Sequence, residues 1–354
     1  MPVETEIRGP GAAVWWAVGI AAGLCLGGLA CDASAPPTAK TAKPDPAPAP
    51  TASAERPGPG PDPKSAAVLP TRFDDAPRIA AIGDVHGDLA ATRAALRLAG
   101  AIGPDGDDWI GGTLVVVQTG DQLDRGDDER AILALLERLE PQAAAAGGAL
   151  HVLNGNHEFM NAMGDLRYVT EGGLSEFNEV EGLKLSDPRI AMVSPPARAR
   201  AAAFTPGGPY ALKLARRNTA VIVGRTAFVH GGILPKHVTG GVPDLERLNA
   251  LTREWFAGRA KTPEQAVAAI MAPDSVVWTR LYAGESPEIC ETLRKTLTLL
   301  DVDRLVVGHT VQKGGITHAC SQRLWRIDVG MARHYGGKPA VLMIEGQTVT
   351  PRAG

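Results

Sequence analysis

Side chains of the metal-binding type recur in five short motifs along the chain. Carboxylates, imidazoles and amide oxygens are ligands of hard-to-borderline divalent metals, and no cysteine lies among them, so thiolate-bound zinc or an iron–sulfur cluster is not indicated. One ion does not need so many ligands, whereas a pair roughly 3.5 to 4 Å apart with a bridging carboxylate does, and such pairs promote phosphoryl transfer. The motifs are GDVHGD (83–88), GDQLDRG (120–126), GNHE (155–158), VHGG (229–232) and GHT (308–310).

Each motif follows a short apolar or β-branched run that predicts a strand. Loops at the ends of strands hold polar side chains on a rigid base, which suits a binding site. A single histidine after a strand is usually a hydrogen-bonded structural residue, but the recurrence in five motifs favours a common metal site. The five expected strands span residues 78–82, 114–118, 149–153, 226–229 and 304–307.

The body that carries these strands begins near Thr71 and alternates strands with helices. Helices are expected at residues 89–99 and 127–139, where apolar residues recur at helical spacing. Residues 164–217 lack clean strand signals and predict a helical or loop insertion. The fold class expected is α/β, with sheets flanked by helices. The further expected strands span 220–223, 324–327 and 340–344, the last paired with 348–350 across a hairpin turn.

In this order, the motifs resemble those of the calcineurin-like metallophosphoesterase superfamily, and within it the phosphoprotein phosphatase group. The resemblance runs over residues 78–330, most of the body. It implies a metallophosphoesterase fold, in which a central β-sandwich is flanked by helices and the metal site lies at strand ends. It also implies a hydrolase of phosphoric esters with two divalent or trivalent metal ions, and these ligand types suit manganese, iron and zinc alike.

The resemblance assigns a role to each ligand of the motifs. Asp84 and His86 are implied to bind the first metal, and Asp121 to bridge the two ions. A metal-bridging hydroxide, formed because the ions lower the pKa of water, is implied to attack phosphorus in line. The implied ligands of the second metal are Asn156, His230 and His309.

Three further residues of these motifs are implied to act on the substrate. His157 is the implied general acid, which protonates the leaving oxygen, and Asp124 keeps its imidazole charged and oriented. Arg125 offers a planar fork of donors that matches phosphate oxygens.

The sequence departs from the common Ser/Thr phosphatases of this group at Asn154, where those members have a phosphate-binding arginine. Residues 277–280, 307–310 and 325–331 instead resemble the bacterial-type Shewanella-like protein phosphatase branch. This makes Arg280 the candidate for a second phosphate-binding arginine. An ordinary surface arginine is the alternative, because exposed arginines are common.

Residues 11–30 contain no charged side chain and indicate the hydrophobic region of a signal sequence. Residues 28–31, which end it, resemble a bacterial lipobox, although Gly28 stands where leucine is usual. The resemblance implies that Cys31 is the lipidated first residue of the mature protein. An uncleaved membrane anchor is the alternative, because roughly 20 apolar residues suffice to span a bilayer. Both alternatives predict an exported, membrane-tethered protein, either periplasmic or on the cell surface.

Three regions are therefore expected along the chain. Residues 1–31 form the signal sequence or anchor, and residues 32–70 form a disordered linker, rich in proline and alanine, that cannot bury a core. Residues 71–354 form the catalytic domain. Its two cysteines, Cys290 and Cys320, suggest a disulfide in an exported protein, with two reduced thiols as the alternative. The histidines expected to be structural are His151, His237, His318 and His334.

The formal net charge of −3, from 36 basic and 39 acidic residues, gives no basic footprint for a nucleic-acid partner. The expected partners are a phosphorylated protein or a small phosphoester and, through the N-terminus, a membrane. The main hypothesis is a phosphomonoester hydrolase that acts on phosphoproteins. A broad phosphatase or phosphodiesterase for nucleotides or small phosphoesters is the alternative, and a non-catalytic, metal-stabilised binding module is a third hypothesis.

Overall fold

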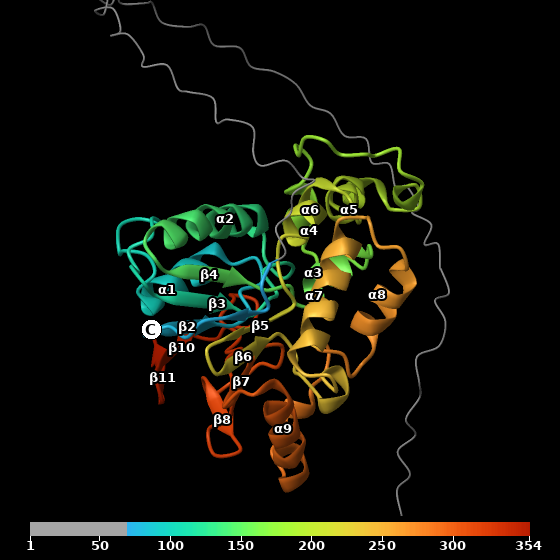
Figure 1. Ribbon diagram of the computed structural model, residues 1–354. Coiled ribbons are helices and arrows are strands. Elements are labelled where there is room, and N and C mark those ends of the chain that lie inside the picture. The colour runs from blue at the N-terminus through green and yellow to red at the C-terminus, as the bar shows by residue number, and fades with distance from the viewer. Residues whose placement is uncertain (1–68) are drawn as a thin grey trace, which may run out of the picture. The chain divides into compact units, whose positions relative to one another are not determined.

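Two β-sheets packed face to face form the centre of the protein in the computed structural model, which describes residues 69–354 (Figure 1). The strands are β1 (Arg72–Phe73), β2 (Ile79–Ile82), β3 (Val115–Gln118), β4 (Ala149–Val152), β5 (Ala220–Val223), β6 (Thr226–Val229), β7 (Arg304–Val307), β8 (Thr317–Ala319), β9 (Leu324–Arg326), β10 (Ala340–Glu345) and β11 (Thr348–Ala353). One sheet has the order β1-β5-β6-β7-β9-β8, and the other has the order β11-β10-β2-β3-β4. This arrangement confirms the predicted sandwich.

Strand β2 shows how the sandwich is filled, because its side chains alternate between the two faces of its sheet. Ile79 and Ala81 belong to the apolar layer between the sheets, where they join Phe228 of β6. Ala80 and Ile82 face the other way and pack beneath helices. A strand buried on both faces has a continuous apolar sequence, as residues 79–82 do.

Helices cover the outer face of each sheet (Figure 1). The α-helices are α1 (Leu89–Ala99), α2 (Glu129–Ala145), α3 (Asn156–Ala162), α4 (Glu171–Ser175), α5 (Arg198–Phe204), α6 (Pro209–Leu214), α7 (Val242–Phe256), α8 (Pro263–Met271) and α9 (Pro287–Leu300). Helices α1 and α2 pack on the sheet that contains β2, while α7, α8 and α9 share a core with β5, β6 and β7. The 3-10 turns are Pro188–Ile190, Pro195–Ala197, Pro235–His237 and Leu281–Ala283.

Helix α1 has the predicted bounds because both of its ends are capped. The side chain of Asp88 accepts a hydrogen bond from Ala91 N at 2.9 Å, which satisfies one of the free amides of the first turn. Gly100 ends the helix in the left-handed conformation, with a φ of 76°. Helix α2 instead runs to Ala145, beyond the predicted end at residue 139, with Pro141 inside it on the exposed side.

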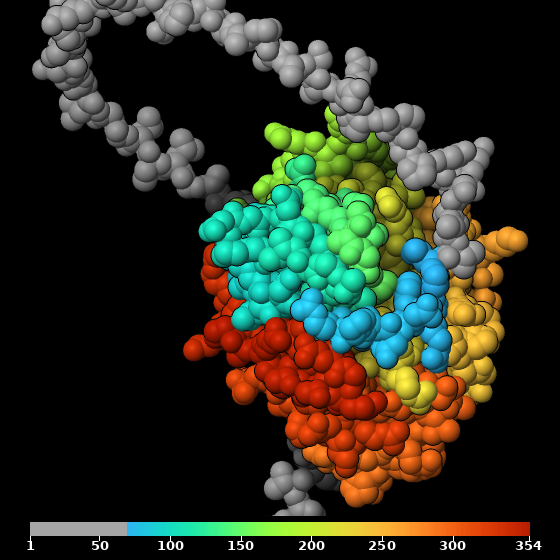
Figure 2. Space-filling view, turned by 60° about the vertical axis from the view of Figure 1, so that its left-hand side comes forward, coloured from blue at the N-terminus to red at the C-terminus, as the bar shows by residue number. Residues whose placement is uncertain are grey.

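The C-terminal hairpin forms as predicted, with Ile344 of β10 opposite Val349 of β11. Strand β10 also pairs with β2, so the end of the chain lies beside the first part of the described body, as Figure 2 shows in red and blue. Residues 164–217 contain helices α4, α5 and α6, two 3-10 turns and no strand, which matches the predicted insertion.

The predicted signal sequence with Cys31, and all of the predicted linker except its last two residues, lie outside the described residues. From residue 69 to residue 354, no helix has both the length and the apolar character that a membrane span requires.

Candidate functional site

The loops of the five motifs meet where strands of both sheets end. Strands β2, β3 and β4 run parallel in one sheet, and β6 and β7 run parallel in the other. Parallel strands end at the same edge, so the loops that follow them come together. The side chains that meet there, all of them buried, are Asp84, His86, Asp121, Asp124, Asn156, His157, His230 and His309.

The backbone of these loops is held in a conformation that side chains disfavour. In the described part of the chain, nine residues other than glycine have a positive φ, and five of them belong to this site. Such a conformation persists only where the surrounding structure holds it, and it is concentrated at functional sites. The five are His86 (40°), Asp121 (56°), Asp124 (68°), Arg125 (70°) and His309 (65°).

Two glycines allow the backbone to approach the carboxylates of the site closely. A Cβ atom on Gly155 would lie 2.3 Å from Asp121 Oδ1, and a Cβ atom on Gly308 would lie 2.4 Å from Asp84 Oδ1. Both separations are far inside van der Waals contact, so a larger residue at either position would displace a carboxylate. The glycines of the GNHE and GHT motifs therefore shape the site itself.

Asp121 lies between two groups of possible metal ligands. Its Oδ2 atom is 3.7 Å from His86 Nε2 on one side and 3.2 Å from His230 Nε2 on the other. Asp84 belongs to the first side, with Oδ2 at 4.0 Å from His86 Nε2. A carboxylate shared by two groups is the arrangement that a bridged pair of ions requires.

The second group converges on His230. Its Nε2 atom lies 2.8 Å from Asn156 Oδ1 and 3.1 Å from His309 Nδ1. The amide nitrogen of Asn156 contacts Met160 Sδ at 3.7 Å, which directs the amide oxygen toward the histidines. Asp121, His230 and His309 can present ligand atoms within 4.8 Å of one another, a spacing that fits one metal ion.

Hydrogen bonds to backbone carbonyls fix the histidine tautomers. Nδ1 of His86 lies 3.0 Å from Leu123 O, and Nδ1 of His230 lies 3.0 Å from Thr119 O. Because a carbonyl only accepts, each Nδ1 must carry a proton, so Nε2 is the atom of the neutral imidazole that can bind a metal ion. Nε2 of His309 is buried without a hydrogen-bond partner. This donor set fits divalent metal ions.

Buried carboxylates give the site an excess of negative charge. Burial, together with repulsion from Asp328 and Asp121, raises the pKa of Asp84 well above its usual value. Burial also raises the pKa of Asp328 to about 6 and that of Glu158 to about 7. Bound cations would offset this repulsion, since an ion is the largest local charge in such a site.

Glu158, the last residue of the GNHE motif, connects the loop after β3 to the start of α3. Its Oε2 atom accepts hydrogen bonds from Asp121 N at 2.9 Å and Gly155 N at 2.7 Å. Its Oε1 atom accepts from Gln122 N at 2.9 Å. One side chain thus sets the position of Asp121 relative to the helix that carries Asn156.

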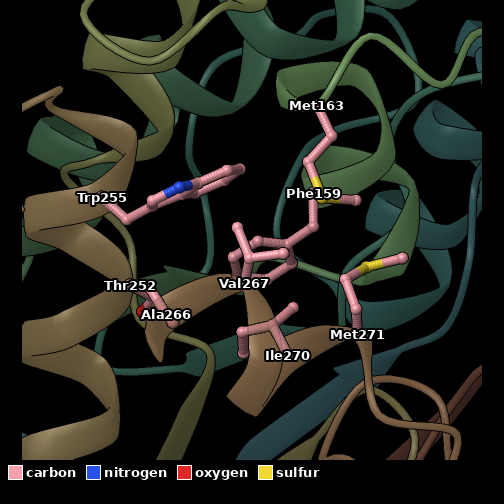
Figure 3. A pocket seen from close by; sticks show the side chains of 8 residues that line it. All are labelled: Phe159, Met163, Thr252, Trp255, Ala266, Val267, Ile270 and Met271. Atoms are coloured by element: carbon pink, nitrogen blue, oxygen red, sulfur yellow. The ribbon is translucent and has the colours of Figure 1, made fainter. Parts of the chain in front are cut away.

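The opposite face of α3 packs against α7 and α8 (Figure 3). The ring of Phe159 lies 5.8 Å from that of Trp255, measured between centroids, and Met163 lines the same apolar pocket with Ile270 of α8. Helix α3 is therefore held from behind by apolar contacts while its first residues face the site.

His157 forms a dyad with Asp124. Its Nδ1 atom lies 2.5 Å from Asp124 Oδ2, and its Nε2 atom lies 3.7 Å from Asp121 Oδ2. Burial alone would disfavour the charged imidazole, but the carboxylates of Asp121 and Asp124 outweigh burial and raise the pKa of His157 to about 9. His157 is close enough to His86 and Asp121 to be a third ligand of the same ion. An imidazole that keeps its proton cannot bind a metal ion through that nitrogen, so the raised pKa favours a role for His157 as a proton donor.

Arg125 lies beside the dyad between two aromatic rings. Its guanidinium carbon is 4.0 Å from the centroid of the Tyr168 ring and 5.7 Å from that of Tyr335. Its Nη1 atom donates to His334 Nε2 at 3.3 Å. His334, expected to be structural or to border the substrate cleft, thus contacts the candidate phosphate-binding arginine.

Arg280 is exposed and lies next to the second ligand group. Its Nη1 atom donates to the carbonyl of His309 at 2.9 Å and to Thr310 Oγ1 at 3.0 Å. Asn154 is fully buried, and its amide donates to Leu214 O at 3.1 Å. The position that holds an arginine in common Ser/Thr phosphatases thus faces the interior here, whereas Arg280 borders the site.

Several side chains around the site were not anticipated from the sequence. Tyr168 comes from the insertion, Tyr335 follows the segment 325–331, and neither stands in a recognisable motif. Asp328 lies within that segment, which was singled out from the sequence. Only the structure shows that Asp328 lies near Asp84. A fully buried arginine of the insertion, Arg200, also reaches Asp124.

The two cysteines of the body form a disulfide in the structure. Cys290 lies in α9 and Cys320 follows β8, with Cα atoms 5.3 Å apart. The enclosed stretch of chain contains His309, so the bond ties the helix that precedes β7 to the hairpin that follows the last motif.

Residues 77–313 match the sequence profile of the family described as calcineurin-like phosphoesterase. Shewanella-like protein phosphatase 2 of Arabidopsis thaliana is 41% identical over 307 residues, which cover 78% of this chain and 77% of that protein. Shewanella-like protein phosphatase 1 of Plasmodium berghei is 30% identical over 72% of this chain and 67% of that protein.

Among solved structures, a cold-active protein tyrosine phosphatase of a psychrophilic Shewanella species has a similar fold. The TM-score is 0.66, with 23% sequence identity over 82% of this chain and 84% of that one. A protein serine/threonine phosphatase of Saccharomyces cerevisiae gives a TM-score of 0.52 at 14% identity, over 80% and 82% of the two chains. Both likenesses support the fold.

Proposed function

Because this chain belongs to the calcineurin-like phosphoesterase family and is a phosphoester hydrolase, we propose that it removes phosphate from phosphorylated protein side chains with two metal ions and a histidine general acid. One observation carries this proposal. Asp121 lies between two groups of ligand atoms, and the dyad of His157 and Asp124 lies beside it. Such a site can bind a phosphate group and donate a proton on the leaving-group side.

The first ion would be held by Asp84, His86 and Asp121, and the second by Asp121 together with the remaining ligands of the motifs. When bound, such ions lower the pKa of water and neutralise charge on the phosphate. The ligand types suit manganese, iron and zinc alike. The ligands that complete the second set are Asn156, His230 and His309.

The proposed acid is His157, whose proton is held by its two acidic neighbours. Asp124 occupies Nδ1, so the proton available to a substrate is the one on Nε2. The Asp124 carboxylate favours the charged imidazole, which can protonate an alkoxide or phenoxide as the bond to phosphorus breaks.

Arg125 and Arg280 are proposed to bind the oxygens of the phosphate group. They approach the site from different elements, Arg125 from the loop after β3 and Arg280 from the segment between α8 and α9, where it contacts His309. Two planar guanidinium groups can donate hydrogen bonds to several phosphate oxygens at once and fix the phosphorus for attack. Tyr168 holds Arg125 in place by stacking.

The protein substrate is supported by the relatives. The proteins of Arabidopsis thaliana and Plasmodium berghei are named as protein phosphatases, and both match most of this chain. Arg280 and Tyr335, which border the site, are both exposed.

The test compares initial rates of the purified, metal-loaded, full-length chain on phosphopeptides, p-nitrophenyl phosphate and bis(p-nitrophenyl) phosphate. We expect hydrolysis of both monoesters and little of the diester. A preference for the diester would contradict the monoesterase assignment and support a phosphodiesterase. No turnover of any of the three would leave only a metal-stabilised binding module.

We also propose that residues 1–31 export the protein and that residues 32–70 tether the catalytic domain, 71–354, to a membrane. The support is the uncharged stretch 11–30, which ends at Cys31. Fractionation of cells, with mass spectrometry of the mature N-terminus, tests this. A lipidated Cys31 in the membrane fraction is expected, and a protein that keeps Met1 and is found in the cytosol would contradict it.

A further inference from the structure

Arg200 is an arginine of helix α5, in the insertion, whose side chain has no exposed surface. Its Nη2 atom donates to Asp124 Oδ1 at 3.1 Å and to Glu129 Oε1 at 2.7 Å. A charged side chain is almost never fully buried unless it is paired, so this arginine is held by its partners. One of those partners is the carboxylate that binds His157.

The carboxylate of Asp124 is held on both of its oxygens. Oδ2 contacts His157, while Oδ1 accepts one hydrogen bond from Arg200 and another from Asn161 Nδ2 at 2.9 Å. Two donors on Oδ1 fix the plane of the carboxylate, and the plane sets the direction in which Oδ2 meets the imidazole. Arg200 thus acts on the orientation of His157 through Asp124.

Asn161 connects the same groups by a second route. Its Oδ1 atom accepts from Arg200 Nε at 2.8 Å, and its Nδ2 atom also donates to the carbonyl of His157 at 2.9 Å. One amide therefore links the arginine, the aspartate and the backbone of the histidine. Every polar side-chain atom of Arg200, Asp124 and Asn161 has a hydrogen-bond partner.

The guanidinium of Arg200 is fixed by the insertion itself. Nη1 donates to the carbonyl of Gly173 at 2.9 Å, and the group lies 5.1 Å from the ring centroid of Phe177 and 5.3 Å from that of Phe204. Glu129 at the start of α2 binds it from the other side. Because these contacts fix the guanidinium of Arg200, Arg200 restrains the position of Asp124 relative to the insertion.

The arginine supplies the counter-charge in this buried cluster. Asp124 and Glu129 are two carboxylates without exposed surface, and Glu129 Oε1 accepts from Asp124 N. Arg200 pairs with both carboxylates. Without Arg200, the two carboxylates would repel each other in a dry environment.

We propose that Arg200 is a positioning residue for the general acid: it fixes Asp124, and through it the imidazole of His157, so that the insertion completes the proton donor of the site. This inference rests on the proposed function, because it assumes that His157 donates the proton. The inference predicts that loss of Arg200 affects one step of the reaction and not metal binding. Loss of Arg200 impairs the step in which the leaving oxygen is protonated and leaves the metal ligands in place.

The test measures kcat/KM of the full-length chain on two monoesters with different leaving groups, phenyl phosphate and p-nitrophenyl phosphate. A poor leaving group depends on the acid more than a good one does. We expect Arg200→Gln to lose on the order of 10²-fold on phenyl phosphate, as for a misplaced catalytic group, and much less on p-nitrophenyl phosphate. The metal content of this variant should equal that of the unaltered chain.

Two variants separate positioning from general damage. Arg304→Gln removes another buried arginine, at the start of β7 and at the opposite end of that strand from His309, and should lower both rates in parallel or not at all. Asn161→Ala removes the other donor to Asp124 Oδ1 and should show the same leaving-group selectivity as Arg200→Gln, to a smaller degree. Asn161→Ala also carries the test if Arg200→Gln does not fold.

His157→Asn and Asp124→Asn, measured alongside, separate the acid role of His157 from the positioning role of Arg200. If His157→Asn is selective for phenyl phosphate while Arg200→Gln and Asn161→Ala lower both rates equally, the positioning role is wrong and the acid stands. If His157→Asn shows no selectivity, the acid assignment itself is wrong. The positioning role also requires that the double variant, Arg200→Gln with Asp124→Asn, hydrolyses phenyl phosphate with the same kcat/KM as Asp124→Asn alone.

Discussion

The proposed metal ligands and the support of the proposed general acid are built in different ways. Each proposed ligand follows a strand or begins the next helix, within a motif of seven residues or fewer, and its direction is set by nearby backbone. The dyad of His157 and Asp124 is also contacted by Arg200 and Tyr168, which come from an insertion without strands. The comparison suggests that metal binding is fixed by the sheets, and proton donation by the insertion.

The largest expected effect comes from the residue at the centre of the ligand groups. Asp121→Asn removes the negative charge shared by both groups, so we expect loss of bound metal and a fall in activity on the order of 10⁴-fold or more. Elemental analysis of the purified variant measures the first and phosphopeptide hydrolysis the second. Asp108→Asn, which changes an exposed acid paired with Arg138, is the control and should keep both. Normal metal content in Asp121→Asn would remove this residue from the bridge.

The next largest effect is expected from the proposed general acid, His157. His157→Asn should keep the metal ions, because the imidazole is engaged by Asp124, and should slow hydrolysis of a poor leaving group by roughly 10²- to 10⁴-fold. Single-turnover rates on phenyl phosphate provide the measurement. His318→Asn, an exposed histidine of β8, should change neither quantity. Metal loss in His157→Asn would show that this residue is a ligand and not the acid.

The sequence predicted the strands and motifs that carry the proposed ligands, but not the contacts that the insertion makes with the dyad. The strands before the motifs and helix α1 were predicted within a residue of their bounds, because apolar runs and caps are local signals. Strands β1 and β8 are too short, at two and three residues, to show any periodicity. Arg200 stands in an alanine-rich stretch that gives no sign of a partner in Asp124, 76 positions away in sequence. Contacts of that kind are set by tertiary packing alone.

Arg125 should give a smaller effect, on substrate binding. Arg125→Lys keeps the charge but loses the planar fork and the stacking on Tyr168, so we expect kcat/KM to fall by about 10- to 100-fold, mostly through KM. Steady-state kinetics on a phosphopeptide measure this. A change in kcat alone would mean that Arg125 acts during the chemical step and not in binding.

Arg280 should give the smallest effect of the set on activity, since its side chain is exposed and water screens its charge. Arg280→Gln is expected to raise KM by roughly threefold to tenfold, the range for one ordinary hydrogen bond, because water screens the charge. An unchanged KM for phosphopeptides would make it an ordinary surface arginine and leave Arg125 as the proposed phosphate-binding arginine.

The disulfide should affect stability and leave the chemistry unchanged. It closes a loop with a sequence separation of 30, so replacing both Cys290 and Cys320 by Ser should lower the free energy of unfolding by about 3 kcal/mol. Denaturant unfolding of the full-length chain measures this. Equal stability with and without a reductant would show that the bond does not form.

The central claim, that one carboxylate joins two metal sites, is tested most directly by titrating the metal-free, full-length chain with manganese. Bound ions per chain and phosphopeptide hydrolysis are measured on the same samples. The account predicts two ions per chain, with activity rising as the second site fills. Full activity with a single bound ion would contradict it.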